Sequence, residues 1–111
     1  MDKYFDYYTP DKWMIIKING KNPHYRVFGS WYGGYLDGDS WRMNSGIKKV
    51  SHDGDFYLFE GYTGSIYKCH KNSYGASIYS IGILNNMIST QPEFGIEILP
   101  EDVKITELEF K

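Results

Sequence analysis

The sequence predicts an α+β domain in which an antiparallel β-meander of about five to seven strands, either as an open sheet or as a half-barrel, packs on one α-helix. Up to residue 70, the chain consists of short alternating segments joined by turns that contain glycine, which is typical of antiparallel strands. Beyond residue 76, apolar residues recur instead at the helical spacing. A length of 111 residues suits one domain, so we expect residues 1–111 to form a single unit.

The first half of the chain predicts three strands. The run "KWMIIKI", 12–18, is apolar and β-branched, and "NGKNP" after it is a strong turn signal because Asn-Gly tolerates positive φ. The segment "HYRVFGSWY", 24–32, carries aromatic rings on both faces, which predicts a strand that is covered on both sides or central. In "SWRMNSGIKKV", 40–50, Gly46 interrupts the alternation and predicts a bulge or a close approach of the backbone.

The remaining elements follow from further turns and from one change of period. "FYLFE" and "SIYKCH" are expected to be strands, because the turns "SHDGD" and "GYTG" precede them. Residues 77–89 predict the helix, with Ser77 as its N-cap and Gln91-Pro92 at its end. "FGIEIL", 94–99, and "VKITELEF", 103–110, alternate again and predict one or two closing strands.

Aromatic residues make up 18% of the chain, and tyrosine, with 11 residues, is the commonest of them. Rings at this density either fill a core or form a platform for a flat ligand. In "GSWYGGYLDGDSWRMNSG", the alternation predicts that Trp31 and Trp41 share a core face with Val27, Met43 and Ile47. The opposite face and the loop then remain for recognition.

Charge and cysteine content exclude several classes of protein. The net charge is −2, and arginine is rare among the 12 basic residues, which argues against binding to nucleic acid or to a membrane surface. Cys69 is the only cysteine, so no intrachain disulfide is expected and a cytoplasmic location is predicted. The first residues lack the pattern of a signal peptide, and no apolar run has the length of a membrane span.

The sequence predicts no metal site, no cofactor and no established catalytic motif. The loops 37–39 and 53–55 space two aspartates as a calcium loop does but lack its further ligands, so we expect ordinary turns. Cys69 and His70 are adjacent, and their side chains point to opposite faces of a strand, which argues against a thiolate–imidazole pair. His24 and His70 as acid and base leave a small phosphodiester hydrolase as the weakest alternative.

Binding is the function that the residue pattern favours. Aromatic rings beside cations suit a nucleotide-like ligand, because the rings stack on a base while the cations bind phosphates. The loop 71–76 leads into the predicted helix, whose first N–H groups carry a partial positive charge. The residues expected to bind the ligand are Tyr32, Tyr35, Arg42, Asn44, Lys68, His70, Lys71, Asn72 and Ser73.

The phrases "SWRMNSGI" and "YKCHKNSYG" resemble small accessory proteins encoded by tailed phages, over residues 28–75. The resemblance carries no activity, cofactor or catalytic residue across, but it implies a non-enzymatic protein that acts in the host cytoplasm. One mechanism is the sequestration of a small nucleotide, such as a cyclic signal of host immunity, in a pocket of a homo-oligomer. The alternative is an inhibitor that occludes a host enzyme or defence complex through exposed tyrosines and tryptophans.

Overall fold

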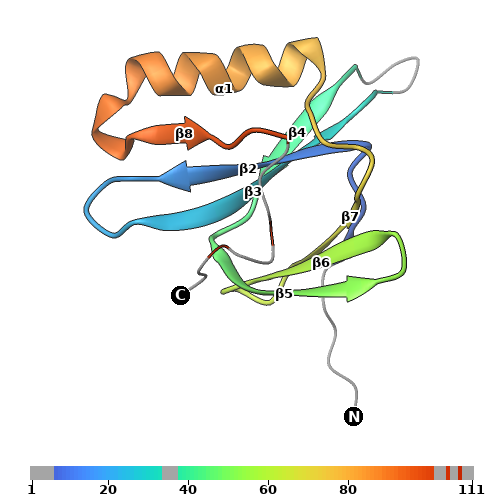
Figure 1. Cartoon of the computed structure of the whole chain (residues 1–111). Helices are drawn as coiled ribbons and strands as arrows, with labels where there is room; N and C mark the ends of the chain where they lie inside the picture. The colour runs from blue at the N-terminus through green and yellow to red at the C-terminus, as the bar shows by residue number, and fades with distance from the viewer. Residues whose placement is uncertain (1–6, 34–37, 102–104, 106–107, 109–111) are drawn as a thin grey trace.

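The computed structural model describes residues 7–33, 38–101, 105 and 108. Within these residues, two four-stranded sheets and one α-helix form three layers, with one sheet between the helix and the other sheet (Figure 1). The predicted α+β class, with a strand meander packed on a single helix, is confirmed. The strands are divided between two sheets, and no helix in the described ranges is long and apolar enough to cross a membrane.

The middle layer, which we call the central sheet, is antiparallel throughout. Its strands are, in spatial order, β4 (Ser40–Met43), β3 (His24–Trp31), β2 (Lys12–Ile18) and β8 (Ile96–Ile98). Helix α1 (Ile78–Thr90) covers one face of this sheet, and the short 3-10 helix η1 (Pro92–Phe94) connects α1 to β8 (Figure 1). The predicted strand over 94–99 is thus present as the shorter β8.

The third layer, which we call the outer sheet, joins a three-stranded meander to a strand near the N-terminus. Its strands are, in spatial order, β1 (Tyr7–Tyr8), β7 (Ile66–His70), β6 (Phe56–Gly61) and β5 (Ile47–Asp53). Strands β5, β6 and β7 pair antiparallel, as expected for neighbours joined by tight turns. Strand β1 pairs with β7 in parallel, so segments far apart in the sequence become neighbours.

Strand β2 is buried on both faces and separates two apolar cores. Trp13 and Ile15 point toward the outer sheet, whereas Met14, Ile16 and Ile18 point toward α1. A strand that is covered on both sides needs apolar residues at every position, which explains why β2 is a continuous apolar run. Strand β3 also contributes to both cores, so the prediction that it is covered on both sides is confirmed.

The prediction that Trp31 and Trp41 share one core face is wrong. Residues opposite each other in an antiparallel pair share a face, and Trp41 lies opposite Ser30. Trp41 therefore points toward α1 and stacks on Phe28, with 5.5 Å between ring centroids, whereas Trp31 points toward the outer sheet. Both are partly buried, and Trp13 is the tryptophan with the least exposed surface, 1%.

Helix α1 begins and ends where the sequence predicts. The Ser77 hydroxyl accepts a hydrogen bond from the Ser80 N–H at 3.1 Å, which confirms Ser77 as the N-cap. The helix ends at Thr90, and its C-cap Gln91 directly precedes the proline that opens η1. The predicted strand over 103–110 falls mainly outside the described residues, and Ile105 and Leu108 are not in a strand.

The chain passes from the central sheet to the outer sheet at residues 44–46. Gly46 has a φ of 137°, and a methyl group on its Cα would lie 3.0 Å from the Tyr62 ring, so the predicted close approach is confirmed. Asn44 is buried beside it, and its Oδ1 accepts a hydrogen bond from the Val27 N–H at 2.9 Å. Asn44 thus stabilises the passage of the chain between the sheets, which places Ile47 in the core that the two sheets share.

Candidate ligand-binding site

The Tyr8 and Trp31 rings and the Arg42 guanidinium form a cluster where β1 faces the central sheet. The parallel register pairs Tyr8 with Tyr67, so both side chains face the core, and their ring centroids are 5.1 Å apart. Tyr7 alternates with Tyr8 and points to the other face of the outer sheet, where 62% of its surface is exposed. The two-residue strand β1 therefore brings one tyrosine into the space between the sheets.

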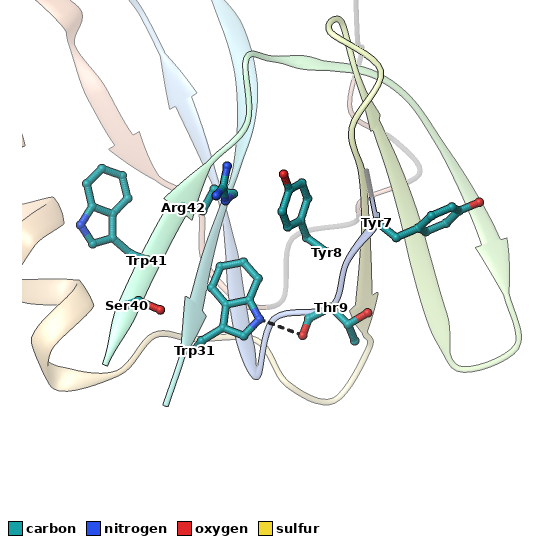
Figure 2. Close-up of a pocket in the computed structure, with 7 residues that line it drawn as sticks. All are labelled: Tyr7, Tyr8, Thr9, Trp31, Ser40, Trp41 and Arg42. Atoms are coloured by element: carbon teal, nitrogen blue, oxygen red, sulfur yellow. Dashed lines mark hydrogen bonds between the residues drawn. The ribbon is translucent and has the colours of Figure 1, made fainter. Parts of the chain in front are cut away.

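Arg42 reaches this tyrosine from the opposite side. It lies on β4 opposite Gly29 of β3, and its Cζ is 4.6 Å from the centroid of the Tyr8 ring (Figure 2). A guanidinium over an aromatic face at this distance is a favourable cation–π contact. The ion pairs of the described residues are Lys49–Glu60 and Lys68–Asp53, so no described carboxylate neutralises Arg42.

Trp31 completes the cluster, and its ring occupies space that a side chain at Gly29 would fill. The Trp31 ring meets the Tyr8 ring edge-on at 6.4 Å, and its Nε1–H donates to the Thr9 carbonyl at 3.1 Å (Figure 2). A methyl group on Gly29 would lie 3.3 Å from the Trp31 ring and 3.2 Å from the Pro10 side chain. The missing side chain therefore lets the indole fold back over its own strand.

These side chains border a pocket of about 380 Å³, which we call the Arg42 pocket. Its volume falls in the range of small-molecule sites, about 300–1,000 Å³. Figure 2 shows Tyr8, Trp31 and Arg42 turned toward one another, while Trp41 and Tyr7 point away on opposite sides. The lining residues are Tyr7, Tyr8, Thr9, Trp31, Ser40, Trp41 and Arg42.

Burial disfavours the ionised forms of two side chains in the core next to this cluster, Tyr67 and Cys69. Burial raises the pKa of the Tyr67 phenol, and the nearby Arg42 charge opposes part of that rise. Burial also raises the pKa of the Cys69 thiol well above its ordinary value, and Cys69 has no exposed surface. Burial therefore makes the Cys69 thiol a poor nucleophile.

The structure separates Arg42 from the other cations that the sequence predicted for the same site. Lys68 and His70 lie on the face of the outer sheet that points away from the central sheet, because β7 places Tyr67 and Cys69 on the inner face. Lys68 lies over the Phe56 ring at 4.7 Å, and the His70 ring meets the same ring at 5.0 Å. They form a separate cluster rather than a second wall of the Arg42 pocket.

The loop after β7 is used for packing as well as for connection. Lys71 lies over the Tyr57 ring at 5.2 Å, and Asn72 is exposed. The Ser73 carbonyl accepts a hydrogen bond from the Trp13 N–H at 3.2 Å, so this part of the loop is tied to β2. None of the three lines the Arg42 pocket.

Three further residues that were expected to bind the ligand do not line the Arg42 pocket as described. Asn44 is buried at the crossing between the sheets, where its amide is hydrogen-bonded to the backbone, so it is not exposed to a ligand. Tyr32 follows β3 and is 54% exposed but does not line the pocket. Tyr35 lies outside the described residues.

The two histidines of the hydrolase alternative lie in different sheets. His24 is on β3, where its Nε2 is 2.9 Å from Arg26 Nε, whereas His70 is on β7. Among the residues that the structure describes, no three His, Cys, Asp or Glu side chains are grouped to hold a metal ion. The two histidines of this weakest alternative are therefore divided between the central and the outer sheet.

Sequence reasoning missed Tyr8 and assigned Trp31 to the core alone, although Trp31 also lines the pocket. The alternation of β3 correctly puts Trp31 on the face of Val27, but it does not tell which layer covers that face. Tyr8 belongs to a two-residue strand whose partner is β7, and no local pattern predicts such a pairing. The pair "YY" before "TP" is the one local sequence feature that could have indicated a short strand here.

Comparison with protein-family models, with curated proteins and with solved structures finds no significant match to this chain. The geometry of the Arg42 pocket therefore carries the functional inference.

Proposed function

We propose that this protein is a non-enzymatic binding protein that takes a small anionic aromatic ligand of the nucleotide class in the Arg42 pocket. The observation that carries the proposal is the Arg42 guanidinium, stacked on Tyr8 with no described carboxylate as its partner. Its N–H groups suit a phosphate, because charge-assisted hydrogen bonds from arginine to phosphate are among the strongest in proteins. The partly buried Trp31 ring, which meets Tyr8 edge-on, is an aromatic surface on which a base can stack.

The biological role that we propose follows the phage resemblance. A protein that holds a nucleotide in such a pocket removes it from solution without chemistry, so a host signal would be sequestered rather than destroyed. We also propose that the protein self-associates, because a second copy at the mouth of the pocket would exclude water from the ligand. Native mass spectrometry with and without ligand measures both the oligomer and the number of bound ligands.

The test of the proposal is a panel of linear and cyclic nucleotides. At least one member is expected to raise the melting temperature, since a ligand that binds only the folded state stabilises it. Chromatography after incubation is expected to return the same compound intact. The absence of any stabilisation across the panel would contradict the proposal, and turnover of the ligand would contradict its non-enzymatic part.

Arg42→Met tests the site itself. The substitution keeps an unbranched side chain over Tyr8 but removes the charge, so the affinity for the best nucleotide is expected to fall at least about tenfold. Lys48→Met is the matched control, because it removes one positive charge from an exposed position of β5. Calorimetric titration measures both variants. Equal affinity in Arg42→Met and the unmodified protein would place the ligand elsewhere.

A second candidate function, inhibition of a host protein, is favoured by the start of α1. Ile78 is 91% exposed and Tyr79 is 51% exposed, so two adjacent apolar side chains face the solvent. If they are anchors, replacing both by serine is expected to abolish capture of a partner from bacterial lysate, even with nucleotide present. Tyr32→Ser removes an equally exposed tyrosine and is the control. Unchanged capture by the double variant would contradict this candidate.

A further inference from the structure

The face of the central sheet that α1 covers contains a cation. Arg26 lies on β3 opposite Ile16, and residues opposite each other share a face, so Arg26 is on the same side as the core beneath α1. Its side chain is half-buried. Burial lowers the pKa of the Arg26 guanidinium, because the charged form loses hydration. A charge in this position is costly unless it is paired.

Among the described residues, Arg26 contacts a histidine ring and a methionine sulfur but no carboxylate. Its Nε–H donates to His24 Nε2 at 2.9 Å, and its Nη1 is 3.6 Å from the Met43 sulfur, a weak acceptor. His24 Nδ1 is 2.7 Å from the Asn22 carbonyl, so Nδ1 carries the proton and Nε2 offers its lone pair. Neither ion pair of the described residues includes Arg26, so its remaining N–H groups have no described acceptor.

An apolar groove of about 380 Å³ runs beside Arg26, between α1 and the central sheet. Arg26 and Gln91 are its polar residues. The flexible side chains of Met43 and Met87 line it, and methionines adapt to ligands of varied shape. Its apolar lining consists of Ile18, Trp41, Met43, Met87, Phe94 and Ile96.

We infer that this groove binds a small amphipathic molecule, with an anionic head group on Arg26 and an apolar body between α1 and the central sheet. The guanidinium, which has no described carboxylate as a partner, selects the head, which is a carboxylate or a phosphate, and the lining selects an apolar chain. The groove is distinct from the Arg42 pocket, because Trp41, which borders both, points its ring toward α1 and away from Arg42 (Figure 2). The inference therefore does not depend on nucleotide binding.

The test uses the whole protein with 13C-labelled methionine methyl groups and three probes with the same chain: sodium octanoate, monooctyl phosphate and 1-octanol. At least one of the two anions is expected to shift the Met43 and Met87 methyl resonances and to bind about tenfold or more tightly than 1-octanol. Whichever anion binds more tightly identifies the head group, and either result supports the inference. Equal binding of all three probes, or unshifted Met87 resonances, would overturn it.

Arg26→Met is the direct variant. It is expected to lose the preference for the anion while binding 1-octanol within about twofold of the unmodified protein, since only the head group loses its partner. Lys48→Met, at an exposed position of β5, is the control and is expected to keep the preference. An unchanged preference in Arg26→Met would overturn the assignment of the head group.

Met87→Glu provides an independent variant in case Arg26→Met does not fold. Met87 is partly buried on α1, so the substitution places a negative charge at the groove while leaving the central sheet intact. It is expected to weaken binding of the anion several-fold more than binding of 1-octanol. Equal weakening of both would show that the head group lies away from the groove and would overturn the inference.

Discussion

Trp13→Ala is expected to lower the free energy of unfolding by about 3–5 kcal/mol, the usual cost of truncating a large buried aromatic residue. The Trp13 ring is packed among three other rings, with centroids 5.9 Å from Tyr57, 5.5 Å from Phe59 and 4.9 Å from Tyr74. Its Nε1–H also donates to the His70 carbonyl at 2.6 Å. Alanine would therefore leave a cavity between the two sheets and remove a hydrogen bond that joins them.

Urea unfolding followed by circular dichroism measures this loss, and Trp31→Ala is the comparison. Trp31 is only partly buried, so the same truncation removes less apolar surface from the folded state. We expect a clearly smaller loss for Trp31→Ala. If the two variants lost the same free energy of unfolding, the larger contribution that we assign to Trp13 from its deeper burial would be contradicted.

Asn44→Ala is expected to cost about 1–3 kcal/mol, because it leaves a buried backbone donor without its acceptor. Asn44 Oδ1 accepts from the Val27 N–H at 2.9 Å, and the Asn44 N–H donates to the Val27 carbonyl at 3.2 Å. The side chain thus continues the β3–β4 pairing at the point where the chain leaves the central sheet. The amide hydrogen of Val27 is therefore also expected to exchange faster in the variant.

Asn72→Ala is the matched control for Asn44. Asn72 is exposed, and its hydrogen bond to His70 Nδ1 comes from the backbone N–H, which alanine keeps. A change within about 0.5 kcal/mol is expected there. If Asn44→Ala were as mild as the control but weakened ligand binding, the residue would belong to a site, as the sequence first indicated.

The two proposed sites lie on opposite faces of the central sheet. Arg42 on β4 points between the sheets toward Tyr8, and Arg26 on β3 points into the layer under α1. Each arginine faces a pocket and neither is paired with a described carboxylate. Because the probes differ, a nucleotide for one and an alkyl acid for the other, failure of one proposal leaves the other open to its own test.

The candidate site could be predicted only in part. The alternation of β4 correctly separates Arg42 from Trp41, since alternation reports which neighbours in the sequence share a side. Lys68 and His70 share one face of their strand, as alternation predicts, yet β7 belongs to the other sheet and turns them to its far face. Alternation determines sidedness within one strand, but not which sheet the strand joins.

The sequence by itself determined the local structure. The apolar run of β2, the capping by Ser77 and the break at Gly46 each act over a few residues, through period, hydrogen bonding and φ preference. Only the tertiary structure decided that the strands form two sheets, that β1 pairs in parallel with β7, and that Trp31 and Trp41 face different layers. These features depend on contacts between distant segments, whose free energy comes from burial of the whole core rather than from any local pattern.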